Sequence, residues 1–174
     1  MSQPHGWMPA VDAEAVHALL CESDAYQAAK TGTRAPARRP ETTRRLVEAG
    51  AVRVLSGDAG PIAMFTLTET AAFDVAAAGY EPSPRPLYLQ RLAVGAEAAA
   101  AGSLVGVQAL RRAIEEAQAL GASVLRCEAN PDLVGTRQLL ERLGFQQRGP
   151  VHADDTRRWV YLELPLDPPV TATV

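Results

Sequence analysis

The chain has 174 residues, a length typical of one domain with a hydrophobic core of ordinary size. Seventeen basic residues against twenty acidic ones give a net charge of −3, which is too weakly acidic to indicate nucleic acid or an anionic membrane as a partner. Hydrophobic residues make up 47% of the chain and charged residues 21%, which is the balance of a globular protein and excludes a disordered one.

The first ten residues and the cysteine content bear on compartment and metal binding. Met1–Ala10 carries two prolines, no lysine or arginine and no apolar run, so we expect neither a secretory signal nor a membrane anchor. No stretch approaches the roughly 20 apolar residues that a membrane span requires, which favours a cytoplasmic protein. Cys21 and Cys127 are too few for a disulfide framework, and the three histidines lack zinc-ligand spacing. We expect two reduced thiols and no metal site.

The first fifty residues predict two helices joined by a loop. A short extended piece at Gly6–Met8 precedes a helix whose N-cap is Asp12, because a carboxylate can accept the free N–H groups of a first turn. Prolines, a glycine and arginines make Thr31–Pro40 an exposed loop. A second helix at Glu41–Ala49 stops at Gly50, which suits the left-handed conformation after a helix end.

The middle of the chain has the residue pattern of strands. Ala51–Leu55 and Ile62–Thr68 flank a segment with glycines and a proline, which predicts a hairpin. Small residues and three prolines make Ala71–Pro86 a long surface loop. The next strand is Tyr88–Val94.

The following segment changes period. Apolar residues recur at spacings of three and four along Ser103–Leu120, with charged residues on the opposite side, so we predict an amphipathic helix. Gly121 is placed to end that helix. A strand at Ser123–Ala129 comes immediately after it.

The C-terminal part contains one more helix and two more strands. The helix begins at Asn130-Pro131-Asp132, because proline tolerates a first turn and Asn or Asp caps it, and it ends at Gly144. Phe145–Arg148 and Arg158–Leu164 are predicted strands. The whole order is a mixed α/β arrangement. We assign residues 1–166 to a single domain and residues 167–174 to a flexible tail.

Three consecutive motifs carry a resemblance to a known family. They are Leu89-Gln90-Arg91-Leu92-Ala93-Val94, Leu125-Arg126-Cys127-Glu128-Ala129-Asn130-Pro131 and Leu139-Leu140-Glu141-Arg142-Leu143-Gly144-Phe145, with the long helix after the first. This order resembles the GNAT superfamily of acyl-CoA-dependent N-acyltransferases. The resemblance implies an α/β (α+β) domain with a mixed central sheet flanked by helices, and a cleft where the strands at 88–94 and 123–129 splay apart.

The resemblance also implies where an acyl donor binds. Pantetheine pairs with a strand edge as an added peptide strand does, and pyrophosphate meets free backbone N–H groups at a helix N-terminus. The donor-binding residues implied in this way are Leu92, Ala93, Val94, Gly102, Ser103, Leu104, Val105, Gly106, Val107 and Asn130. The family's loop motif has a Gln or Arg, a Gly, and a Gly or Ala where this chain has Ala101, Leu104 and Gly106. Two donors therefore stay open: an acyl-CoA, or acyl-phosphopantetheine on a carrier protein.

Glu128 is the candidate catalytic residue. In family members with this Leu-x-x-Glu pattern, the glutamate is the general base while an amine attacks the thioester carbonyl. A solvated strand glutamate, or a partner of Arg126, is the alternative. The family commonly places a tyrosine that protonates the departing thiolate where this chain has Leu140, but a thiol pKa near about 8.5 lets thiolate leave unprotonated.

The sequence excludes two classes of hydrolase and leaves a second hypothesis for the function. No serine-hydrolase elbow and no Gly-Lys-Ser/Thr loop is present, and Cys127 is predicted to be a core residue. The second hypothesis is a catalytically silent module of the same fold that binds an acyl ligand or a partner protein. For an enzyme, the acceptor is a small-molecule amine, and the chain is a monomer or homodimer. Gln90 and Arg91 lie where the acceptor enters in similar proteins, and Asp24, Tyr26, Asp74 and Tyr80 border that region.

Overall fold

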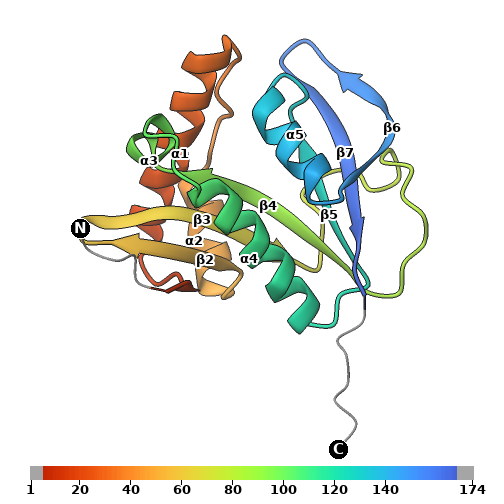
Figure 1. The fold of residues 1–174 in the computed structure, drawn as a ribbon, viewed down its shortest axis with the longest axis horizontal. Helices are drawn as coiled ribbons and strands as arrows, with labels where there is room; N and C mark the ends of the chain where they lie inside the picture. Colours follow the sequence, from red (N-terminus) through yellow and green to blue (C-terminus); the bar gives the residue numbers. More distant parts are fainter. Residues whose placement is uncertain (1–5, 168–174) are drawn as a thin grey trace, which may run out of the picture. The chain divides into compact units, whose positions relative to one another are not determined.

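The structure, a computed structural model, describes residues 6–167, so the predicted tail beyond residue 167 lies outside the described residues. The elements in chain order are β1 (Met8–Pro9), α1 (Ala13–Thr31), α2 (Pro40–Glu48), β2 (Val52–Gly57), β3 (Gly60–Thr68), β4 (Pro86–Val94), α3 (Ala96–Ala100), α4 (Val105–Ala119), β5 (Val124–Ala129), α5 (Val134–Arg142), β6 (Gln146–Ala153) and β7 (Arg158–Pro165). The strands form one mixed sheet in the order β1-β2-β3-β4-β5-β7-β6 (Figure 1). The predicted α/β class is confirmed.

The contacts divide this chain into two compact units. The first comprises Met1–Leu67 and Arg91–Leu110, and the second comprises Thr68–Gln90 and Arg111–Val174. Strand β4 and helix α4 each run from one unit into the other. The two units are therefore described separately, each with the part of β4 and α4 that belongs to it.

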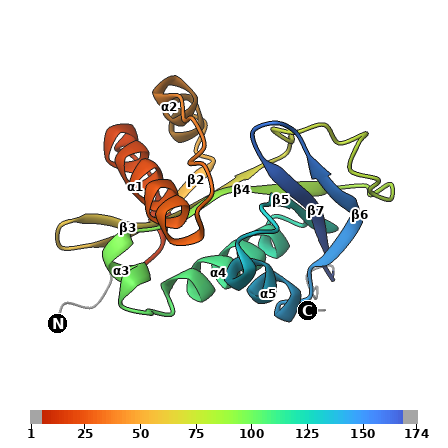
Figure 2. The same ribbon diagram turned by 90° about the horizontal axis from the view of Figure 1, so that it is seen from above.

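The first unit is a small antiparallel sheet covered by two helices. Strand β2 pairs with β1 and with β3, and α1 and α2 lie on one face of these strands (Figure 2). The predicted cap is confirmed, because Asp12 Oδ1 accepts hydrogen bonds of 3.0 Å from the amides of Glu14 and Ala15. The buried residues that join helices and strands are Ala10, Val16, Leu19, Leu20, Val47, Val52, Val54, Met64 and Ala93.

The second unit is built on the last strands. Strand β5 pairs with β4 in parallel from Pro86–Val124 to Tyr88–Arg126, and with β7 in antiparallel along its whole length. Strands β6 and β7 form a hairpin with an irregularity between Arg148 and His152. Successive residues of β5 alternate between the two faces of the sheet, and helix α5 lies on one of these faces (Figure 2).

The segment before β4 differs from its prediction. It is a loop, but not a surface loop throughout, because Ala78 is only 1% exposed. The hydroxyl of Tyr80 reaches the carbonyl oxygens of Cys127 and Leu162 at 3.2 Å each. Phe73 contacts the rings of both Tyr80 and Tyr161. The loop therefore supplies core side chains to the second unit.

Three further element boundaries were predicted wrongly. Ala96–Ala100 forms helix α3, although alanines with one glutamate show no apolar periodicity from which to predict it. Helix α5 starts at Val134, because the side chain of Asn130 accepts the amide of Asp132 in a preceding turn. Strand β6 continues to Ala153 instead of stopping at Arg148, with its irregularity where Gly149 adopts a φ of +67°.

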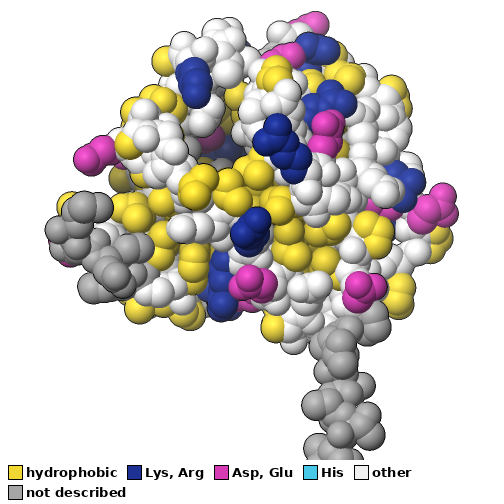
Figure 3. Space-filling model, in the orientation of Figure 1, with side chains coloured by type: hydrophobic (Ala, Val, Ile, Leu, Met, Phe, Trp, Pro, Cys, Tyr) yellow, Lys and Arg dark blue, Asp and Glu magenta, His cyan; other side chains and the backbone are white. Residues whose placement is uncertain are grey.

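Within residues 6–167, no helix is both long and apolar enough to cross a membrane. The same residues contain no group of three or more His, Cys, Asp or Glu that could hold a metal ion. On the face seen in Figure 3, basic and acidic side chains are interspersed.

Candidate functional site

In the first unit, the end of β4 is tied to helix α1. The amide of Val94 donates to Ser23 Oγ at 3.2 Å, and the amide of Ala96 donates to Glu22 Oε1 at 2.8 Å. Ser23 is buried, so the first of these bonds is shielded from water. The Val94 amide is therefore not available to a pantetheine carbonyl.

The residues just before Val94 are less exposed than an open strand edge. Ala93 is 2% exposed and packs in the core of the first unit, while Leu92 is half-buried. The side chain of Ala93 thus contributes to the core. Contact of a donor with Leu92 or Ala93 is left to their backbone groups.

The start of α4 presents unbonded amides. The first bond of the helix ladder runs from the amide of Gln108 to the carbonyl of Leu104, at 2.9 Å. The amides from Leu104 to Val107 come before this bond, and such first-turn amides have no acceptor within their own helix. They also lie at the positive end of the helix dipole. This arrangement can bind an anion.

Gly106 and Leu104 differ in what they place at this helix start. A Cβ atom at Gly106 would lie 3.7 Å from a methyl group of Val94, which is an ordinary van der Waals contact, so the start of α4 packs close to the end of β4. The side chain of Leu104 is 69% exposed. Val105 and Val107 are half-buried.

Two of the predicted donor residues use their amides elsewhere. The amide of Gly102 donates to Ala99 and the amide of Ser103 donates to Ala98, at 3.2 Å each, and these bonds close the end of α3. Gly102 has a φ of +65°, which a glycine adopts without strain. Both residues are exposed, and the bonds of their amides set the path of the loop into α4.

In the second unit, Glu128 lies near the end of β5 and is ion-paired. Arg157 Nη1 donates to Glu128 Oε1, and Nη2 lies 3.4 Å from Oε2. The side chain of Glu128 is 19% exposed and that of Arg157 is 53% exposed. The alternative that Glu128 pairs with Arg126 is wrong, because Arg126 is buried and pairs with Glu163 at 3.3 Å.

A row of aromatic side chains from β6 and β7 lies beside this ion pair. The guanidinium carbon of Arg157 lies 4.6 Å from the centre of the Trp159 ring. His152 stacks on Trp159 with ring centres 5.6 Å apart and meets Tyr161 edge-on at 5.1 Å. Tyr161 is the cross-strand neighbour of Glu128. The carboxylate therefore borders an aromatic wall.

A second polar cluster lies between α1, α2 and β4 in the first unit. His17 Nδ1 is 3.0 Å from Thr43 Oγ1, and Cys21 Sγ is 3.5 Å from His17 Nε2. Arg91 Nη1 also donates to Thr43 Oγ1 at 3.0 Å. Burial, followed by the nearby Arg38, lowers the pKa of Arg91. This cluster links the predicted acceptor residue Arg91 to the helices.

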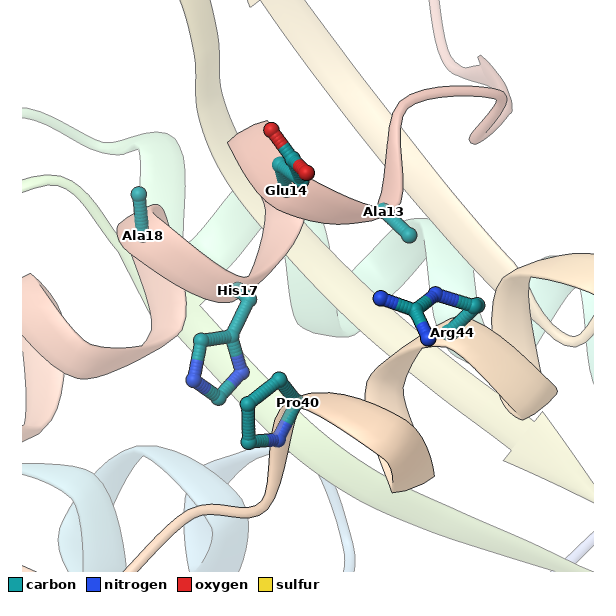
Figure 4. A pocket seen from close by; sticks show the side chains of 6 residues that line it. All are labelled: Ala13, Glu14, His17, Ala18, Pro40 and Arg44. Carbon is teal, nitrogen blue, oxygen red and sulfur yellow. The ribbon is translucent and has the colours of Figure 1, made fainter.

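Beside this cluster is a shallow hollow of about 210 Å³. It is lined by Ala13, Glu14, His17, Ala18, Pro40 and Arg44, and His17 points from α1 toward Pro40 of α2 (Figure 4). Asp24, which borders the acceptor region in similar proteins, is bound by Arg38, at 2.6 Å and 3.1 Å. Its carboxylate is therefore already neutralised.

Comparisons with known proteins bear on the fold. No protein-family model and no curated protein matches the sequence. A Streptococcus agalactiae acetyltransferase of the GNAT family aligns with a TM-score of 0.68 at 18% identity, over 93% of this chain and 95% of that one. A Staphylococcus aureus N-acetyltransferase gives 0.68 at 17% identity, over 95% and 100%. The Salmonella typhimurium protein yncA, solved with its cofactor acetyl-CoA, gives 0.65 at 17% identity, over 99% of both chains. This chain has the GNAT fold.

The GNAT fold extends over far more of the chain than the motifs that predicted it. Those motifs lie within Tyr88–Phe145, whereas the structural likeness reaches 99% of the chain. At these sequence identities the likeness concerns the fold, because one fold carries many activities. The chemistry must therefore be argued from the residues.

Some residues that the GNAT resemblance singled out are structural. Leu140, at the position of the family's tyrosine, is 3% exposed and packs in the core. Cys127 is buried, and this burial raises the pKa of its thiol to about 12, as expected for a core residue. Burial also raises the pKa of Tyr80. Gln90 donates to Thr68 Oγ1 at 2.5 Å within its own unit.

Sequence reasoning missed Arg157, Trp159 and His152. The sequence does indicate that Trp159 and Tyr161 lie together, because the period of two along β7 puts them on one face of the strand. The pairing of β5 with β7 then brings Glu128 to that face. The register of strands far apart in sequence is not readable from a single chain.

Proposed function

We propose that this chain is an N-acyltransferase that moves an acyl group from the phosphopantetheine thioester of an acyl-CoA to the amine of a small molecule. The observation that carries the proposal is the GNAT fold over nearly the whole chain, shared with proteins named acetyltransferases and with one solved with acetyl-CoA.

The residues at the start of α4 support donor binding. The unbonded amides from Leu104 to Val107 suit the pyrophosphate of CoA, since helix N-termini bind such anions. Gly106 has no side chain to obstruct the approach of phosphate. In this proposal a pantetheine amide donates to the Val94 carbonyl, because the Val94 amide is already bound to Ser23.

Glu128 is the proposed general base. A protonated amine transfers a proton to the carboxylate and becomes nucleophilic. The amine nitrogen then bonds to the thioester carbonyl carbon, the carbon–sulfur bond breaks, CoA leaves as thiolate, and water takes the second proton from the nitrogen to give the neutral amide. No side-chain acid is assigned to this last step, because Leu140 cannot donate a proton and a thiolate is a stable leaving group at neutral pH.

Two alternatives rest on specific observations. The segment Ala96–Ala101 carries no basic side chain for the phosphates of CoA, which favours acyl-phosphopantetheine on a carrier protein as the donor, with its single phosphate. Leu140 and the ion pair that occupies Glu128 favour a silent module that binds an acyl ligand or a partner protein. One assay with both donors distinguishes transfer from acyl-CoA, transfer from acyl-phosphopantetheine and a module that transfers no acyl group.

The test is acyl transfer by the full chain. Acetyl-CoA or acetyl-phosphopantetheine is mixed with a panel of primary amines, and mass spectrometry detects the amide. We expect an amide to form, and Glu128→Gln to lower kcat/KM by about 10² or more. Asp132→Asn is the matched control, because Asp132 is also ion-paired to an arginine, Arg158, in the same unit. Absence of any amide with either donor contradicts the proposal.

A further inference from the structure

Arg157 holds its charge between two groups that each attract cations. Its guanidinium donates to the carboxylate of Glu128, and the same group lies 4.6 Å above the centre of the Trp159 ring. A carboxylate beside an aromatic face is the combination by which proteins bind organic ammonium ions. A protein side chain thus occupies a place whose chemistry suits a small cationic ligand.

We propose that Glu128 and Trp159 form a subsite for the ammonium group of the acceptor, and that Arg157 occupies this subsite until the acceptor displaces it. The inference rests on the proposed function, because it assigns the acceptor to the class of amines that are protonated at neutral pH. Glu128 then both binds the ammonium ion and takes its proton. Arg157 is a positioning residue.

The neighbouring aromatic side chains have capacity for more contacts. Among the residues that the structure describes, the buried atoms Trp159 Nε1 and His152 Nε2 have no hydrogen-bond partner. Buried polar atoms of this kind are normally bonded. The unpaired Trp159 N–H therefore belongs to the same ring that carries the Arg157 guanidinium.

Arg157 can leave without disturbing the fold. Its side chain is 53% exposed, and exposed ion pairs contribute little to stability. Its backbone is fixed independently, because Asp154 Oδ1 accepts the amides of Thr156 and Arg157, at 2.7 Å and 2.9 Å. Displacement thus requires only rotation of a side chain into water.

The test follows Trp159 fluorescence while an unreactive cation is added. The chain has two tryptophans, so Trp7→Phe leaves Trp159 as the only reporter, and the phenylalanine keeps an aromatic ring against Phe65. The probe is tetramethylammonium chloride, with sodium chloride at the same concentration and tert-butanol as its uncharged counterpart. No acyl donor is present, so failure of binding and failure of acyl transfer are observed separately.

In this background we expect Arg157→Gln to bind tetramethylammonium at least about tenfold more tightly than the protein that retains Arg157. Arg158→Gln is the matched control, because it removes the same charge from the neighbouring residue, whose partner is Asp132, and should leave the titration unchanged. Adding Glu128→Gln to Arg157→Gln should abolish the tight binding.

Equal titrations for Arg157→Gln and Arg158→Gln overturn the inference, as does tight binding that persists without Glu128. If Arg157→Gln alters the circular dichroism spectrum, Arg157→Met, which keeps an unbranched apolar side chain, takes its place with the same expectation. The two results are independent. If the protein binds the cation but acylates no amine, the proposed function is contradicted and the cation subsite is still supported.

Discussion

Arg91 has a backbone conformation that most side chains avoid. Its φ is +51° within strand β4, in the left-handed region that costs a residue with a Cβ roughly 1–2 kcal/mol. Its guanidinium is half-buried and donates to the buried hydroxyl of Thr43. Backbone strain of this kind persists where the surrounding contacts hold it and often marks functional positions.

Two substitutions separate the backbone of Arg91 from its side chain. Arg91→Ala and Arg91→Gly both lose the bond to Thr43, but only glycine relieves the strained φ. We therefore expect Arg91→Gly to be more stable than Arg91→Ala by about 1 kcal/mol in urea unfolding. Equal stability of the two variants would show that Arg91 does not hold this conformation in solution.

Cys127 should make the fold sensitive to alkali. Burial raises the pKa of its thiol to about 12 in the folded chain, against 9.0 when exposed. Between these values the unfolded chain loses a proton that the folded chain keeps, so stability falls as pH rises, by up to roughly 1.4 kcal/mol per pH unit.

The measurement for Cys127 is urea unfolding at about pH 8 and about pH 10. Burial of Tyr80 acts in the same direction, so the comparison is with Cys127→Ala, which retains Tyr80. We expect a smaller loss of stability at the higher pH in this variant than in the original chain. The same loss in both would contradict a buried, protonated Cys127.

At the residue scale, the features that depend on nearby sequence were predicted correctly. Burial of Cys127 follows from its place on an apolar strand face, and the cap at Asp12 follows from the chemistry of its side chain. The partner of Glu128 was not predictable, since Arg157 lies 29 positions away and reaches it through strand pairing. A long-range contact leaves no trace in a single sequence.

At the element scale, the start of α4 is the proposed binding site for the phosphates of the acyl donor. Gly106 is the second residue of this helix, and a Cβ there would be 3.7 Å from Val94. Valine at this position would put methyl groups where phosphate must approach the amides. We expect Gly106→Val to weaken acetyl-CoA binding by about tenfold or more in calorimetry.

Helix α5 offers the control for that substitution. Gly135 is also the second residue of its helix, and nothing lies within 4 Å of a Cβ built on it. Gly135→Val therefore makes the same change in helix propensity without entering the proposed donor site. If both variants bind acetyl-CoA equally well, the start of α4 is not the phosphate site.

The elements that sequence missed share a physical cause. Helix α3 is short, lacks any fully buried residue and consists of alanines and one glutamate, so no apolar period exists to predict it. Helix α5 starts late because Asn130 uses its side chain in a turn and Leu133 takes the N-cap position. In neither case does hydrophobic periodicity mark the boundary.

At the scale of the whole molecule, the order of elements was the most predictable feature. Period changes mark the hairpin β2–β3 and the helix α4, and these with the motifs of Tyr88–Phe145 predicted the fold that the structural comparisons show. The amides proposed to bind the donor belong to the first unit and Glu128 belongs to the second, and each is assigned from the contacts of its own unit. The central claim is that this chain binds an acyl thioester.

The most direct measurement of that claim is calorimetric titration of the full chain with acetyl-CoA and with acetyl-phosphopantetheine. We predict saturable binding of at least one of these thioesters, weakened by Gly106→Val and unchanged by Gly135→Val. An absence of binding heat with both compounds, across temperatures that would reveal a compensated enthalpy, would contradict an acyltransferase function for this chain.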